Sequence, residues 1–156
     1  PDFPVAVDVL RRAGGKEAFL EKFRAKVKPK HTDVMTLMIL AMAAFYDPDR
    51  ENPGEYHLPF DLETGEIISA RWQCWLDHDP VQMVDRHADA LKSMKLLFID
   101  CGNRDQFRLH HGARMLAKKL RDLSIPHIHE EFDDDHSSVD YRLDHSLPRL
   151  AEVLSP

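Results

Sequence analysis

The sequence predicts an α/β fold in which two parallel strands are joined by a helix. Three observations carry this prediction: a short apolar run at residues 96–99, a helical spacing of apolar residues over 106–120, and an extended segment at 127–132. An apolar run of this length suits a buried parallel strand, and Gly102 closes it. Parallel strands joined by a helix bring the loops at their C-terminal ends to one edge of the sheet.

The chain before these strands has a mainly helical pattern. Residues 5–13 form a helix candidate that Gly14 ends, residues 16–28 form an amphipathic helix before Pro29, and Thr32 suits the N-cap of a third helix. The remaining helical patterns cover residues 33–46, 69–77, 80–92 and 139–154, and residues 47–59 form a loop.

Two side chains with catalytic potential follow the predicted strands. Asp105 lies in the loop after the first strand, and His136 lies in the loop after the second. A histidine that acts as a base needs a carboxylate to fix its tautomer and to stabilise the imidazolium. In one large class of hydrolases the chain order is nucleophile, acid, histidine, and these residues match the second and third places. Asp100 is a rival acid, but it ends the strand itself, so we interpret it as structural.

Four stretches resemble the C-terminal part of the esterase D (S-formylglutathione hydrolase-like) group of esterases. They are IDCGNRDQF, LHHGARMLAKKL, HEEFDDDHSSVDYR and HSLPRLAEVL. The resemblance covers roughly residues 55–154 and is most specific over 96–142. It implies the C-terminal part of an α/β-hydrolase fold, comprising the last two parallel strands with flanking helices, preceded by a helical cap segment. Residues 1–54 would be that cap and residues 55–156 the core part of a single, incomplete unit.

The resemblance also implies the catalytic residues of a carboxylesterase-type serine hydrolase. Asp105 would be the triad acid, His136 the triad base, and a serine on a G-x-S-x-G elbow would precede both. Ser69 and Ser93 are the serines before Asp105, and neither has the flanking glycines that this strained turn requires. Cys74 fails the same test. We therefore expect this chain to be the C-terminal half of a longer hydrolase and to be inactive alone.

The expected partners follow from the small sheet and from the charge. Parallel strands lie inside larger sheets, so we expect the free edge to be covered by the N-terminal half of the same protein or by another chain. The substrate would be a small-molecule ester. A formal net charge of −6 without a basic stripe argues against nucleic acid. The apolar run at 35–45 is too short to span a bilayer, so no membrane partner is expected.

The cysteines and histidines indicate which disulfide, metal and cofactor sites to expect. The two cysteines show no CxxC spacing and form no disulfide framework, which fits a reducing compartment and a cytoplasmic protein. His127 and His129 alternate on one strand near His136, which leaves a metal site open. Solvent-facing histidines are the favoured interpretation, so no metal and no cofactor are expected. The alternative function is a non-catalytic binding or scaffold domain of hydrolase ancestry.

Overall fold

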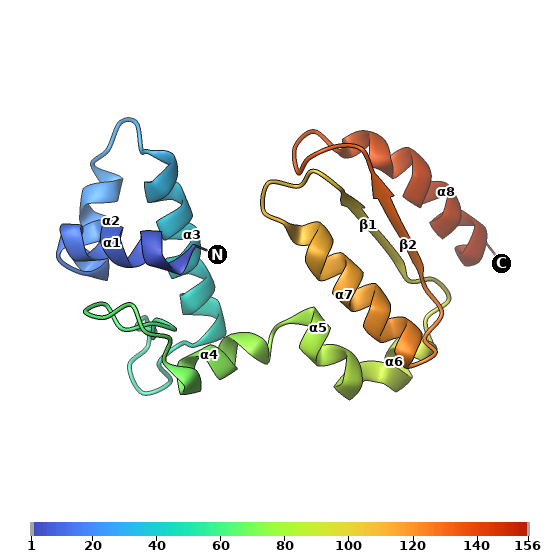
Figure 1. The fold of residues 1–156 in the computed structure, drawn as a ribbon, viewed down its shortest axis with the longest axis horizontal. Helices are drawn as coiled ribbons and strands as arrows, with labels where there is room; N and C mark the ends of the chain where they lie inside the picture. Colours follow the sequence, from blue (N-terminus) through green and yellow to red (C-terminus); the bar gives the residue numbers. More distant parts are fainter. Residues whose placement is uncertain (1, 156) are drawn as a thin grey trace. The chain divides into compact units, whose positions relative to one another are not determined.

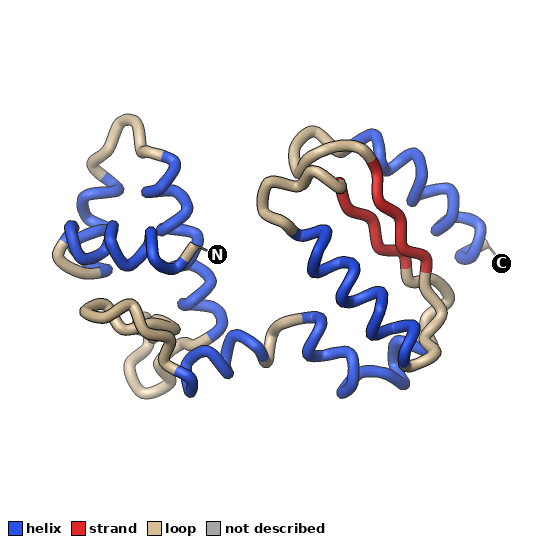
Figure 2. Tube along the Cα trace, viewed as in Figure 1, coloured by secondary structure: helices blue, strands red, loops and turns tan. Residues whose placement is uncertain are grey.

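The computed structural model describes residues 2–155, and it is built from helices and one pair of strands (Figure 1, Figure 2). Residue contacts divide the chain into an N-terminal unit, residues 1–79, and a C-terminal unit, residues 80–156. The sequence placed a boundary after residue 54 within one incomplete unit. The division falls later because residues 55–79 contribute Phe60 and Trp75 to the core of the N-terminal helices.

The N-terminal unit is helical. Its elements are α1 (Phe3–Ala13), α2 (Lys16–Arg24), α3 (His31–Tyr46) and α4 (Ser69–Leu76). As the sequence predicted, α1 ends at Gly14, whose positive φ of 96° closes the last turn. The core gathers the apolar sides of α1 and α3 around Phe60 and Trp75. Its buried members are Ala6, Val7, Leu10, Phe19, Ile39, Leu40, Ala43, Phe60 and Trp75.

The start of α3 differs from the sequence prediction, which gave Thr32 as its N-cap. The cap position is Lys30, and its backbone N–H donates to the Asp33 carboxylate over 2.8 Å. The Lys26 ammonium lies 2.7 Å from the same buried carboxylate. Hydrogen bonds from Lys26 and from the Lys30 backbone hold the pKa of Asp33 below its ordinary value. The carboxylate of Asp33, the third residue of α3, thus binds the backbone N–H of the cap residue, and Thr32 lies inside the helix.

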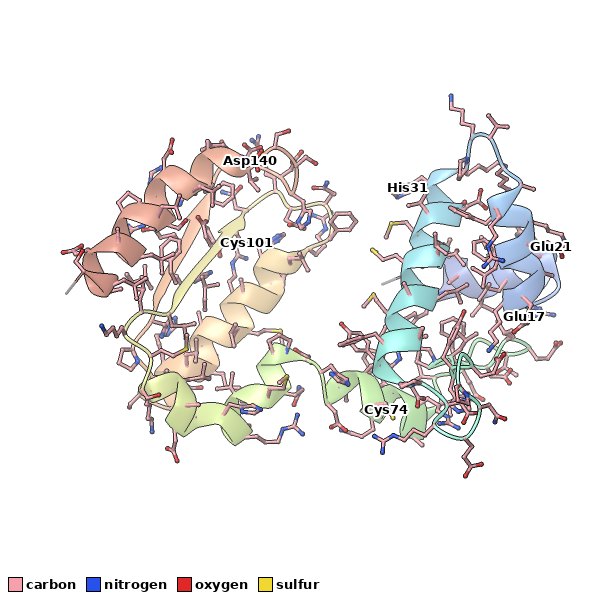
Figure 3. All side chains as sticks on the ribbon, turned by 180° about the vertical axis from the view of Figure 1, so that it is seen from behind. Glu17, Glu21, His31, Cys74, Cys101 and Asp140 are labelled. Carbon is pink, nitrogen blue, oxygen red and sulfur yellow. The ribbon has the colours of Figure 1, made fainter. Side chains whose placement is uncertain are left out.

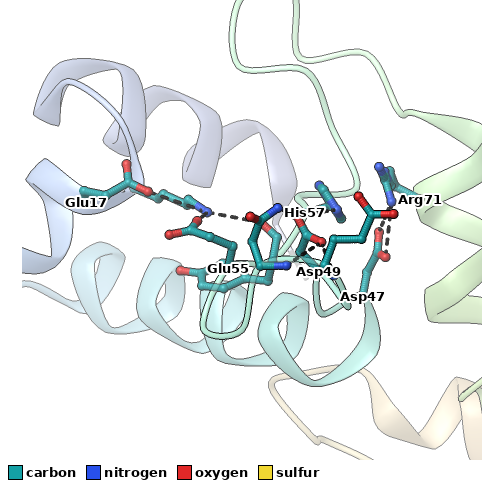
Figure 4. Close-up of polar contacts among 10 residues, drawn as sticks. Glu17, Asp47, Asp49, Glu55, His57 and Arg71 are labelled. Carbon is teal, nitrogen blue, oxygen red and sulfur yellow. Dashed lines mark hydrogen bonds and ion pairs between the residues drawn. The ribbon is translucent and has the colours of Figure 1, made fainter.

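Ion pairs tie the loop between α3 and α4 to the helices of this unit (Figure 4). The Lys16 ammonium lies 2.6 Å from Glu55 and also contacts Glu17 over 3.5 Å. Near the start of the loop, Arg71 of α4 lies 3.4 Å from the buried Asp47. These contacts add to the two isolated strand bridges within the loop, which pair Pro48 with Tyr56 and Phe60 with Ile67.

The C-terminal unit is a two-stranded parallel sheet with helices around it. It comprises α5 (Pro80–Met83), the 3₁₀ helix η1 (Val84–His87), α6 (Ala88–Lys92), β1 (Phe98–Gly102), α7 (Leu109–Asp122), β2 (Ile128–Phe132), the 3₁₀ helix η2 (Asp140–Arg142) and α8 (Leu143–Leu154). The predicted parallel pairing is confirmed, with Phe98 opposite Ile128 and Gly102 opposite Phe132. The predicted α/β class is confirmed at this level.

Helices α7 and α8 pack on opposite faces of this sheet. Arg114 of α7 forms a paired contact with Glu131, both hydrogen bonds being 2.6 Å long. Arg149 of α8 reaches Glu130, the neighbouring residue of β2, over 2.6 Å. Because successive strand residues point to opposite faces, these contacts place α7 and α8 on either side.

Several predicted boundaries shift in this unit. Helix α7 starts at Leu109 rather than near residue 106, because Asp105 and the residues after it form a turn before the helix. The predicted helix over 80–92 is interrupted by η1. The last helix begins at Leu143 rather than directly after Ser138, and Pro148 is accommodated inside it. The first of these shifts creates the loop that carries the candidate acid.

Candidate active site

Asp105 and His136 meet at the C-terminal edge of the parallel sheet. The His136 Nδ1 atom lies 2.8 Å from Asp105 Oδ2. Asp105 is 2% exposed, whereas the His136 side chain is 49% exposed. The acid is therefore shielded from water while its histidine partner remains accessible. Both residues line a cleft of about 310 Å³ beside β1, together with Gly102, Leu109 and Val139.

Backbone N–H groups that follow Asp105 bind the second oxygen of its carboxylate. Asp105 Oδ1 accepts hydrogen bonds from the backbone N–H groups of Phe107, over 2.7 Å, and of Leu109, over 3.3 Å. Burial raises the pKa of Asp105, but hydrogen bonds from His136, Leu109 and Phe107 outweigh it, so the pKa lies below its ordinary value. The buried acid is thus kept ionised by donors on both of its oxygens.

The loop that carries His136 is bound to the loop that carries Asp105 along its length. The backbone N–H of Asn103 donates to the Phe132 carbonyl over 2.8 Å, and that of Arg104 donates to the Asp134 carbonyl over 3.0 Å. These bonds continue the hydrogen bonding of β1 and β2 beyond the strand ends. They bring the two loops together before any side chain contributes.

Two of the three aspartates before His136 shape its turn. Asp135 accepts a hydrogen bond from the Ser137 backbone N–H over 2.6 Å, which is the bond of an Asx turn around the histidine. Asp134 accepts a hydrogen bond from the Tyr141 hydroxyl over 3.1 Å. Ser138 takes a positive φ of 56°, and Arg108 in the facing loop takes 61°. Left-handed residues other than glycine thus lie on both sides of the pair, as is common at functional sites.

Gly102 allows the two loops to approach each other. A Cβ atom on Gly102 would lie 2.6 Å from the Asp135 carbonyl oxygen and closer still to that of Asp134. Both are backbone atoms, which cannot move away as a flexible side chain would. A glycine at the end of β1 is therefore a steric condition for the position of His136. The sequence identified Gly102 only as the end of a strand.

The other residues considered from the sequence have other partners. Asp100 also lines the cleft, but its Oδ2 accepts a hydrogen bond from Arg142 Nε of η2 over 2.8 Å, in keeping with a structural role. The His127 Nδ1 atom contacts the Ile125 carbonyl over 2.9 Å. Within residues 2–155 no group of three or more His, Cys, Asp or Glu side chains is arranged to hold a metal ion.

Among the described residues that line the cleft there is no serine. Ser69 begins α4 in the N-terminal unit, and the Ser93 hydroxyl donates to the Ala90 carbonyl over 2.7 Å. Cys74 and Cys101 are free thiols of α4 and β1 (Figure 3). Cys101 lines the cleft, but burial and the neighbouring carboxylates, Asp105 first among them, raise its pKa. A raised pKa lowers the fraction of thiolate, which is the nucleophilic form of cysteine.

Comparisons with known proteins leave the family open. No model of a protein family matches the sequence, and a search of curated proteins finds no match. The resemblance to the esterase D group therefore remains a prediction from the sequence. Among the described residues, no helix is both long and apolar enough to cross a membrane.

The Gly102 contact generates a matched pair of substitutions. Gly102→Ala should destabilise the chain by about 1–3 kcal/mol, because the added methyl group pushes the backbone of residues 134–135 away. Gly112→Ala, at the fourth residue of α7 where an added Cβ meets no atom within 4 Å, should instead stabilise it by about 0.5–1 kcal/mol. Urea unfolding measures both. A neutral Gly102→Ala would contradict the close approach of the loops.

The lowered pKa of Asp105 makes the free energy of unfolding depend on pH. Because the folded-state pKa lies below the unfolded value of about 3.9, the unfolded state binds the proton first, and the stabilisation is lost as pH falls through the folded-state pKa. At neutral pH, Asp105→Asn should cost about 1–3 kcal/mol of unfolding free energy. Urea titrations of both proteins should show this difference shrinking below pH ~4. A difference that stays constant with pH would show that the Asp105 charge contributes nothing.

Proposed function

We propose that the C-terminal unit supplies the acid and the base of a carboxylesterase-type serine hydrolase that acts on small-molecule esters. The observation that carries the proposal is the 2.8 Å contact between His136 Nδ1 and the Asp105 carboxylate, which is 2% exposed. A buried, ionised carboxylate on Nδ1 favours the imidazole tautomer whose Nε2 atom is free to accept a proton. The chain order, acid before histidine, agrees with the resemblance to the esterase D group.

In this mechanism the serine hydroxyl attacks the ester carbonyl while His136 Nε2 takes its proton. The imidazolium, stabilised by Asp105, then returns that proton to the leaving alcohol, and an acyl-serine remains. In the second half, Nε2 takes a proton from water, the resulting hydroxide attacks the acyl-serine, and the proton returns to the serine as the acid leaves. Backbone N–H groups near the serine would stabilise the oxyanion. No cofactor is required.

The serine and the oxyanion hole belong to a further segment in this proposal. β1 pairs with β2 on one side, and no strand among residues 2–155 pairs with its other side. The cleft of Asp105 and His136 lies at the C-terminal ends of the two strands. A groove of about 570 Å³ that includes Leu96, Phe98 and Leu143 adjoins it and shares Asp100 and Phe132 with its lining. A strand from the N-terminal half of the same protein, or from another chain, would bury both and deliver the G-x-S-x-G elbow. The same proposal includes the finer fold assignment, which is the C-terminal part of an α/β-hydrolase. It also includes a cytoplasmic location.

A non-catalytic scaffold domain is the second candidate. The observation in its favour is that the cleft lining includes no serine and that its cysteine has a raised pKa. The two candidates differ in the coding sequence that precedes residue 1. An open reading frame with a G-x-S-x-G motif between a strand and a helix supports the hydrolase, and one without it supports the scaffold.

The decisive experiment uses this chain joined to that elbow segment, with p-nitrophenyl acetate as substrate. Asp105→Asn should lower kcat by a factor on the order of 10⁴, because the amide selects the wrong imidazole tautomer. Asp100→Asn should cost far less, because Asp100 binds Arg142 instead. The 156-residue chain alone should hydrolyse the ester no faster than its own His136→Ala variant. Equal losses for the two aspartates, or His136-dependent turnover by the chain alone, would refute the assignment.

A further inference from the structure

Gln106 contacts the histidine loop at two points, one on the main chain and one on a side chain. Its Oε1 atom accepts a hydrogen bond from the His136 backbone N–H over 3.0 Å. Its Nε2 atom lies 3.4 Å from the Ser137 hydroxyl, a longer and weaker contact. The Gln106 side chain therefore contacts His136 and Ser137, while Asp105 binds the His136 ring.

The neighbours of Gln106 complete a continuous set of contacts. Asp105 binds the ring nitrogen, Gln106 binds the backbone N–H, and the Phe107 ring lies edge-on to the imidazole with centroids 5.0 Å apart. Three successive residues of one loop thus fix His136 from three directions.

We propose that Gln106 is a positioning residue: it holds the main chain of His136 so that Nδ1 stays on Asp105 and Nε2 faces the cleft. The inference rests on the proposed function, because it concerns how the base of that reaction is oriented. Gln106 is itself exposed, so its side chain fills no core space. Its contacts with the histidine loop are what its replacement removes.

The two contacts of Gln106 differ in length and therefore in strength. The bond to the His136 N–H is short enough to fix the loop, whereas the Ser137 contact is at the limit of a hydrogen bond. Removing the Gln106 acceptor should therefore release His136, and removing only the Ser137 hydroxyl should not. This contrast gives a control within the same loop.

The test is NMR spectroscopy of the full chain at about pH 8, where imidazole side chains are ordinarily neutral. Gln106→Met keeps the length of the side chain but removes the acceptor. It should speed amide hydrogen exchange at His136 by about fivefold or more, and it should lower the fraction of the Nδ1–H tautomer seen in ¹⁵N shifts. Gln106→Glu keeps the acceptor and should restore slow exchange. Ser137→Ala should match the wild type.

Exchange and tautomer in Gln106→Met that equal those of the wild type would overturn the role of Gln106. Asp105→Asn, measured in parallel, tests the proposed function separately. If Asp105→Asn leaves the His136 tautomer unchanged, the proposal that Asp105 and His136 act as an acid–base pair is refuted, whatever the result for Gln106. If it shifts the tautomer while Gln106→Met shifts nothing, only the positioning role fails. A loss of Nδ1–H in Gln106→Met without a change in melting temperature separates positioning from general stability.

Discussion

The site depends on keeping one carboxylate charged while it is withdrawn from water. Burial alone would favour the neutral acid, and a neutral Asp105 could not stabilise an imidazolium. The backbone N–H of Phe107 in the turn before α7, the N–H of Leu109 at the start of α7, and the ring of His136 supply the compensation. The delayed start of α7 is therefore part of the chemistry, because it turns the residues after Asp105 so that their N–H groups point at its carboxylate.

Parallel pairing supplies the second constraint. Since β1 and β2 run in the same direction, their C-terminal loops emerge together, and backbone bonds from Asn103 and Arg104 continue the pairing into the loops. Gly102 sets how closely they approach. Within the C-terminal unit the acid and the histidine thus meet through the sheet itself, and the side chains refine a contact that the backbone has already made.

The sequence predicted the parts of this arrangement that follow from periodicity. The apolar run before Gly102 and the helical spacing over residues 106–120 gave the strand–helix–strand order, and that order placed Asp105 beside His136. Gln106 and Gly102 could not be assigned their contacts in this way. One makes a bond and the other a close approach to a loop about 30 residues later, and neither leaves a periodic signal. The packing of Phe60 and Trp75 on the N-terminal helices could not be predicted for the same reason, because only tertiary contacts reveal it.

The central claim is that Asp105 fixes the proton of His136 on Nδ1 and leaves Nε2 free to act as a base. A neutron crystal structure of the perdeuterated chain at about pH 8 tests it most directly, because imidazole side chains are ordinarily neutral there. The account predicts deuterium on His136 Nδ1, directed at Asp105 Oδ2, and none on Nε2. Deuterium on Nε2 with a bare Nδ1, or deuterium on the Asp105 carboxyl group, would contradict it.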